Sequence, residues 1–184
     1  MDADDCEALA QSALDESGLN DRPNVDPLVL AVAWGGLRVR PEPHCTPHLI
    51  DGVIVYRAGA SDDAIAWAAA HELSHAMIEW AGVKLERSHE ERCANRIASA
   101  LLLPRRPFLR DLACGDLDHV ASLWPLATPW VLARRITEVR ADTSAALWTR
   151  AGRRALRRAG YAHEPHDATA TWETSAGTIT FVVR

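Results

Sequence analysis

The sequence predicts an α+β protein in which helices surround one small sheet, and three observations lead to this fold class. Apolar residues recur at helical spacing over most of the chain, beginning with residues 3–17. Two runs within residues 37–56 alternate with a period of two, which is typical of short strands. An alanine-rich segment then runs from residue 61 to Gly82, and its small side chains suit a helix that packs closely against a sheet.

Turn and cap residues predict where the helices and strands before that helix begin and end. Asp26-Pro27 is typical of a helix start, and Gly35-Gly36 closes the helix that follows it. Residues 37–40 alternate like a strand. Residues 48–56 are expected to form a hairpin around Asp51-Gly52, the dipeptide favoured in a type I′ turn. We therefore expect two helices and then a small antiparallel sheet.

Two long helices should follow the sheet. Ser61-Asp62-Asp63 offers an N-cap and two acids for a first turn, and Gly82 ends that helix. The next helix is expected from Ser88 to Leu103, with a stop at Pro104. We expect the sheet to pack on the first of these two helices.

The second half is expected to be helical and then to return to strands. Residues 115–140 read as helix, short turn and helix, residues 143–159 as a basic helix, and residues 169–183 as a hairpin. We therefore divide the chain into a core at 1–104, a helical region at 105–160 and a hairpin tail at 161–184.

Composition narrows the classes of protein. Hydrophobic residues make up 48% of the 184, which allows a buried core and argues against wholesale disorder. The longest apolar run, residues 64–70, is too short to cross a bilayer, and the acidic residues 1–5 do not resemble a secretory signal. The four cysteines include no Cys-x-x-Cys pair, so neither a disulfide framework nor a zinc knuckle is indicated. We expect a cytoplasmic protein without membrane contact.

The strongest functional signal is residues 71–75, which read His-Glu-Leu-Ser-His. Two histidines four apart on a helix lie one turn above one another, so both imidazoles of His71 and His75 can point at one metal ion. Glu72 lies about 100° round the helix, from where it can poise a metal-bound water instead of ligating. A metal site still needs a third protein ligand.

Residues of the same helix do not supply that ligand. Glu79 continues the four-residue spacing, but at 1.5 Å rise per residue it lies about 12 Å from His71 along the axis. A metzincin site would need glycine at position 78 and histidine at position 81, where the chain has Ile78 and Ala81. The third ligand is therefore expected on the following helix.

The following helix offers a cluster of His89, Glu90 and Glu91. Apolar spacing points both glutamates roughly inward and does not choose between them. Asn95 lies on the same face as Glu91, where its amide could orient a ligand histidine, and this favours Glu91. The alternative is that Ser88 and Glu91 form a Ser-x-x-Glu capping box, in which Glu91 only caps its helix.

Taken together, these motifs resemble the ImmA/IrrE family of metallopeptidases. The resemblance is carried by residues 71–75, by Glu91-Arg92-Cys93-Ala94-Asn95, by Ala98 and by Leu101-Leu102-Leu103-Pro104, and it covers roughly residues 5–140. Ser74 stands where the family often has glycine, Ile97 where it often has an aromatic residue, and Leu103 where it often has methionine. None of these departures removes a ligand or the base.

The resemblance implies a zincin-like core of gluzincin type. It implies that His71, His75 and Glu91 hold Zn²⁺, that Glu72 is the general base, and that Asn95 supports a ligand. Such proteins are bacterial regulatory enzymes, often encoded beside a helix-turn-helix repressor that they cleave to relieve repression, for example under stress. We therefore expect a zinc metallo-endopeptidase whose partner is such a repressor.

Hydrolysis of a peptide bond also needs a donor that stabilises the oxyanion. Tyr56, His48, His89 and His119 are candidates, and sequence does not select among them.

The second half leaves a competing function open. Residues 115–140 look like a helix-turn-helix, but Pro129 and Trp130 are poor base readers, so we favour a structural cap on the core over direct DNA binding. The arginines of residues 150–158 form a basic face that we interpret as solvated surface. The alternative to a peptidase is a catalytically silent DNA-binding or partner-sensing regulator.

Overall fold

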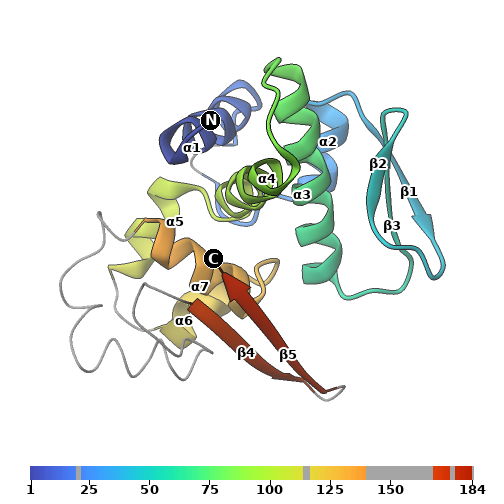
Figure 1. The fold of residues 1–184 in the computed structure, drawn as a ribbon. Coiled ribbons are helices and arrows are strands. Elements are labelled where there is room, and N and C mark those ends of the chain that lie inside the picture. The colour runs from blue at the N-terminus through green and yellow to red at the C-terminus, as the bar shows by residue number, and fades with distance from the viewer. Residues whose placement is uncertain (20–21, 114–116, 140–167, 175–176, 184) are drawn as a thin grey trace.

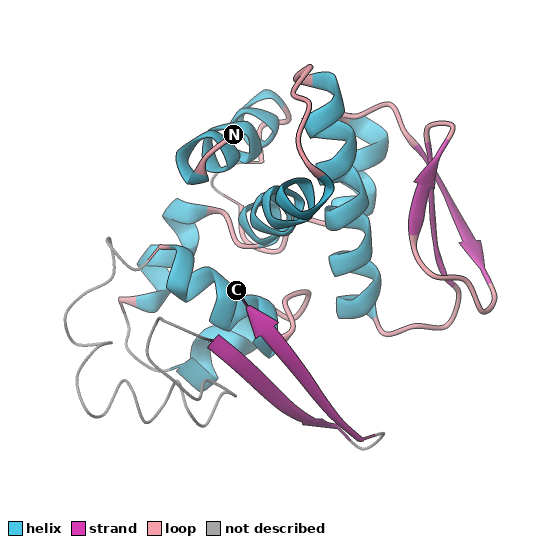
Figure 2. Cartoon of the chain, in the orientation of Figure 1, coloured by secondary structure: helices cyan, strands magenta, loops and turns pink. Residues whose placement is uncertain are grey.

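The computed structural model describes residues 1–19, 22–113, 117–139, 168–174 and 177–183, with side chains described within residues 1–139. Within these residues the protein is α+β, with its helices beside a small three-stranded sheet (β1–β3) and a separate two-stranded sheet (β4 and β5) (Figures 1 and 2). In chain order the elements are α1 (Ala3–Glu16), α2 (Pro27–Ala33), β1 (Arg38–Glu42), β2 (His48–Ile50), β3 (Val53–Arg57), α3 (Asp62–Trp80), α4 (Arg87–Leu102), α5 (Arg105–Leu112), α6 (Leu117–Leu123), α7 (Pro129–Glu138), β4 (Ala168–Thr174) and β5 (Gly177–Val183).

The two N-terminal helices begin at side-chain caps. The Asp2 carboxylate accepts hydrogen bonds from the backbone N–H groups of Asp4 and Asp5, and the Asp2 backbone N–H donates to the Asp5 carboxylate. Asp26 caps α2 through the Leu28 N–H, and Pro27 takes the first helical position, as the sequence predicts. Both helices therefore start where local sequence dictates.

The sheet has the strand order β1-β3-β2. Strands β2 and β3 form the predicted hairpin, and both turn residues have positive φ, 49° at Asp51 and 69° at Gly52, as a type I′ turn requires. Strand β1 pairs with β3 in parallel, however, so the prediction of an antiparallel sheet is wrong for this pair and the sheet is mixed. The short connection of residues 43–47 carries the chain to the far edge, which leaves the central place to β3.

Helix α3 forms the middle of the core, between the sheet and α4 (Figure 1). All of its alanines after Ala64 are buried, and the buried Ser74 hydroxyl donates a 2.6 Å hydrogen bond to the Ala70 carbonyl within the helix. The helix ends before Gly82, whose φ of 69° lets the Val83 N–H bond back to the Ile78 carbonyl. The start near residue 61 and the end at Gly82 agree with the prediction.

Helix α4 begins two residues earlier than the capping-box alternative requires. Its N-cap is Glu86, and Ser88 lies inside the first turn, so Ser88 does not cap this helix. Helix α5 follows Pro104 directly, whereas the sequence predicts a helical region from residue 105 but no particular helix before residue 115. Its apolar pattern is confined to Phe108, Leu109 and Leu112, in a segment of eight residues that has Pro107 in its first turn.

Helix α7 is tied to the core by a buried ion pair. The Arg135 side chain is fully buried and donates to both carboxylate oxygens of Glu7 on α1, at 2.7 and 2.6 Å, while its Nε donates to the Leu103 carbonyl at 2.9 Å. Ser99 on α4 also donates to Glu138 of α7. Packing around Trp124 and Val131 closes a second apolar cluster over α4 and α5. Helix α7 therefore packs on the core, while the interpretation of residues 115–140 as a structural cap and the division of the chain at residue 104 both remain predictions.

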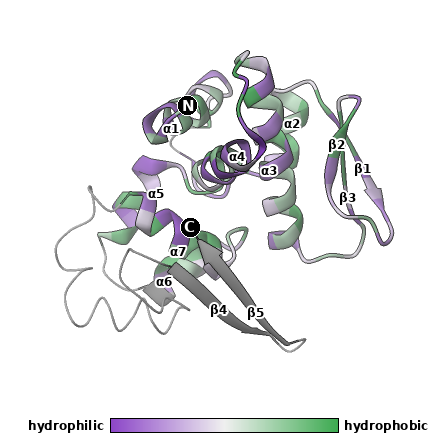
Figure 3. Cartoon of the chain, viewed as in Figure 1, coloured by the Kyte–Doolittle hydropathy of each residue, from purple (hydrophilic) through white to green (hydrophobic). Residues whose placement is uncertain are grey.

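Strands β4 and β5 pair in antiparallel register from Ala168 and Val183 to Thr174 and Gly177. The predicted basic helix of residues 143–159 lies outside the described residues. Most of the described helices carry both hydrophilic and hydrophobic residues (Figure 3). None of the described helices has an apolar stretch long enough to cross a membrane.

Candidate metal centre

Helix α3 presents His71 and His75 on one face, one turn apart. Their ring centroids lie 4.8 Å from each other and their Nε2 atoms 3.2 Å from each other. Both side chains are about four-fifths buried, with 19% and 20% of their surface exposed. Two imidazole nitrogens therefore converge on one point, as their spacing in the sequence predicts.

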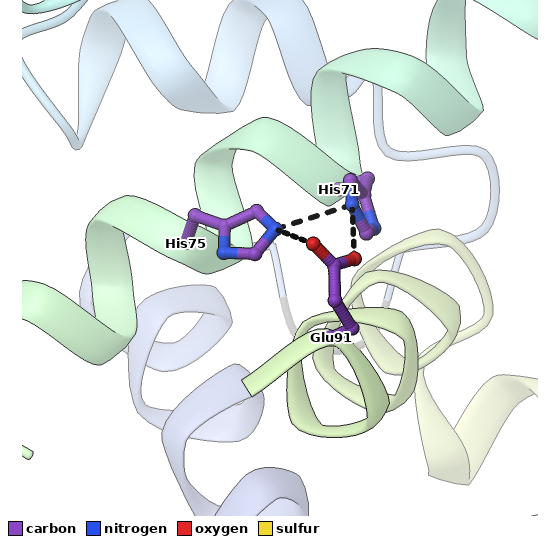
Figure 4. A group of neighbouring side chains, drawn as sticks. All are labelled: His71, His75 and Glu91. Carbon is purple, nitrogen blue, oxygen red and sulfur yellow. Dashed lines mark hydrogen bonds and ion pairs between the residues drawn. The ribbon is translucent and has the colours of Figure 1, made fainter. Parts of the chain in front are cut away.

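Helix α4 brings Glu91 to the same point (Figure 4). Its Oε2 lies 3.4 Å from Nε2 of His71, and its Oε1 lies 3.8 Å from Nε2 of His75. Two ligands at 2.0–2.1 Å from a tetrahedral zinc ion lie about 3.3 Å from each other. The three observed spacings of 3.2, 3.4 and 3.8 Å bracket this value, so the group fits one metal ion of that size.

Glu90 occupies the other side of His75. Its Oε1 lies 2.8 Å from Nδ1 of His75, and because an ionised carboxylate only accepts, Nδ1 carries the proton in this pair. That tautomer leaves the Nε2 lone pair of His75 free to face the metal. Sequence reasoning treated Glu90 only as a rival ligand. The sequence did indicate that both neighbouring glutamates point inward, and this could have suggested that one of them orients a ligand histidine.

The surroundings of His71 favour its neutral form. Its burial lowers its pKa most, the charges of His75 and Arg134 lower it further, and Glu91 and the Asn95 amide act in the opposite direction. A metal binds neutral imidazole, so this lowered pKa favours ligation near neutral pH. Asn95 thus lies beside His71 as predicted, although the buried Nδ1 of His71 has no hydrogen bond of ordinary geometry within the described residues.

Glu72 lies outside the group of three and turns toward the sheet. Burial is the largest cause that raises its pKa, and Glu91 adds to it, whereas the charges of His75 and His48 and a hydrogen bond from the Leu49 backbone N–H lower it. The net shift is upward. A carboxylate whose pKa is raised toward neutrality is a better general base, which is the role that the motif predicts.

The four candidates for the oxyanion donor separate in space. His48 lies within electrostatic reach of Glu72, and its Nδ1 is 2.8 Å from the Thr46 carbonyl. His89 instead contacts the Met1 carbonyl at 2.8 Å, which gives it a structural partner. His119 lies on α6 and Tyr56 on β3. His48 is the candidate whose charge lowers the pKa of the predicted base.

An aromatic pair that sequence reasoning missed borders His71. The ring of Trp67, one helical turn before His71, lies 6.2 Å from the imidazole and 4.7 Å from Trp130 of α7. The guanidinium of Arg134 lies 5.7 Å above the Trp130 ring. The four-residue spacing of Trp67 from His71 was visible in the sequence, but the approach of α7 depends on tertiary packing.

One family model matches the part of the chain that carries this site. The model of the family Peptidase_M78, described as the IrrE N-terminal-like domain, matches residues 36–135. That range includes the sheet, all of α3 and α4, and most of α7. No curated protein and no solved structure matches the chain.

Proposed function

This chain belongs to the ImmA/IrrE family of metallopeptidases, and from that premise we propose that it is a zinc-dependent endopeptidase. His71, His75 and Glu91 would hold the ion, in the His₂Glu set that suits zinc. The observation that carries the proposal is the convergence of these three ligand atoms, all within 4.8 Å of one another, beside a glutamate with a raised pKa.

When bound, zinc would lower the pKa of a coordinated water and polarise the scissile carbonyl. Glu72 would accept the proton of the attacking water and deliver it to the leaving amine. Glu90 would keep Nδ1 of His75 protonated, and Asn95 would orient His71. His48, beside Glu72, is the best-placed of the candidate donors to the oxyanion.

The proposed substrate is a helix-turn-helix repressor encoded beside this chain, and the proposal therefore places the enzyme in the cytoplasm, where such a repressor works. Its support is the family resemblance. Cleavage of the repressor would relieve transcriptional repression.

The test compares the zinc-loaded wild type with Glu72→Gln on that repressor. The proposal expects cleavage by the wild type and a rate at least about 100-fold lower in the variant at equal zinc content. Equal rates would refute the mechanism. Salt-dependent binding to promoter DNA without cleavage, unaffected by zinc removal, would support the catalytically silent regulator instead.

A further inference from the structure

A cavity of about 570 Å³ lies next to the metal centre, and the proposed mechanism does not use it. Glu72 and His75 line one side, so the cavity is continuous with the place where the scissile bond would lie. The connection after α3 and strand β2 supply other walls. A side chain next to the scissile bond could therefore enter it.

Part of the lining is aliphatic. Leu49 comes from β2, Ile78 from the end of α3, and Val83 and Leu85 from the connection to α4. Such a wall favours a side chain with a methylene stem, because the stem is removed from water.

The charged part of the lining is predominantly acidic. Glu72, Glu79 and Glu90 face one basic side chain, Lys84. The Glu90 carboxylate already contacts Nδ1 of His75, and the Glu72 carboxylate is the proposed general base. Glu79 is exposed and makes neither an ion pair nor a hydrogen bond through its side chain to the described residues, so its carboxylate is available to an incoming group.

Glu79 also lies at the negative end of a helix. It is in the last turn of α3, where the backbone dipole favours a cation. An acidic side chain in the cavity would meet three carboxylates. A neutral side chain would use the aliphatic wall only.

We propose that this cavity selects a substrate with arginine or lysine next to the scissile bond, with the stem against the aliphatic wall and the charged head at Glu79. The inference rests on the proposed peptidase function and adds its substrate class. Glu79, which is too far from His71 to be a ligand, becomes the specificity-determining residue.

The first arm of the test measures binding without turnover. Zinc-loaded Glu72→Gln protein is titrated with three randomised decapeptide mixtures, in which one central residue is fixed as arginine, norleucine or glutamate. We expect the arginine mixture to bind about 10-fold more tightly than the norleucine mixture, as a charge-assisted contact gives, and the glutamate mixture most weakly. Equal binding of arginine and norleucine would overturn the inference.

Variants of the cavity are then compared in the same background. Glu79→Gln should reduce the arginine-to-norleucine ratio to about 2 or less, and Lys84→Met, which removes the competing cation, should increase it. Glu86→Gln is the matched control, because Glu86 is an exposed acid outside the cavity lining, and it should keep the ratio. A ratio that falls equally in Glu79→Gln and Glu86→Gln would contradict a specific contact.

The second arm measures cleavage of the same mixtures by the zinc-loaded wild type. Cleavage without a basic preference would overturn the specificity while leaving the peptidase function intact. A basic preference in binding, lost in Glu79→Gln, would support the cavity assignment even if no mixture is cleaved, and only the peptidase function would then fail.

Discussion

Replacing Glu7 by glutamine perturbs the ion pair that attaches α7 to the core. Arg135 has no exposed side-chain surface, and Glu7 has 17%. Both charge-assisted hydrogen bonds of the pair lie at 2.7 Å or less. Glutamine has nearly the same shape as glutamate, so Glu7→Gln removes the charge without leaving a cavity.

The expected loss follows from the burial of the partner that remains. Removing one member of a buried ion pair typically costs 3–5 kcal/mol, because the other charge is left uncompensated. Glu138, 3.6 Å from Nη1 of Arg135, and the Leu103 carbonyl remain as partners. We therefore expect the lower end, about 3 kcal/mol, in the free energy of unfolding at pH 7.

The assay is urea unfolding followed by tryptophan fluorescence. The control is Glu42→Gln, which breaks the exposed Arg40–Glu42 pair and should cost less than about 1 kcal/mol. A loss for Glu7→Gln no larger than that of the control would refute the reasoning.

The same pair predicts a pH dependence of the wild type. Burial raises the pKa of Glu7, but the hydrogen bonds and charge of Arg135 outweigh it, so the folded-state pKa lies below its ordinary value of 4.5. A depressed pKa gives stability that is present above pH 4.5 and is lost as the pH falls through the folded-state value. The stability difference between wild type and Glu7→Gln should therefore shrink in that acidic range. A constant difference would contradict the assignment.

Three further outcomes are expected. Glu90→Gln should weaken zinc affinity about 10- to 100-fold in a chelator competition, because the partner of Nδ1 of His75 is changed; unchanged affinity would remove Glu90 from the site. Glu72→Gln should retain zinc by metal analysis, and loss of the metal would make Glu72 a ligand. Burial, and after it the neighbouring Cys93, raises the pKa of the Cys6 thiol to about 12. Cys6 in the folded protein should therefore resist iodoacetamide at pH 8, while the half-buried Cys45 reacts. Equal labelling of the two cysteines, measured by mass spectrometry, would contradict this.

Local signals in the sequence were sufficient for most of the fold. The cap at Asp26 and the turn at Asp51-Gly52 each depend on only a few residues, and the structure has helix α2 at the first and the β2–β3 hairpin at the second. The partner of β1 was not predictable in this way, because pairing with β3 depends on how a short connection crosses the sheet. The bounds of helix α5 were not predicted because it spans only eight residues and contains Pro107, which disfavours a helix in a reading of the sequence alone.

In the candidate site, too, one part was predictable from local sequence and another part depends on tertiary packing. The four-residue spacing of His71 and His75 is a local property, and the structure brings Glu91 to both. Glu91 lies with the Nε2 atoms of the two histidines, whereas Glu90 contacts Nδ1 of His75. This difference depends on the rotation and tilt of α4 against α3, which the apolar periodicity of the sequence does not determine. The approach of Trp130 toward Trp67 likewise depends on the buried Arg135 contacts of α7.

The most direct test of the central claim is the zinc content of the purified protein after dialysis, measured for the wild type, Glu91→Ala and Glu42→Ala. The three converging ligand atoms predict about one zinc per chain in the wild type and the exposed control, and almost none in Glu91→Ala. Full zinc content in Glu91→Ala would contradict the proposed centre.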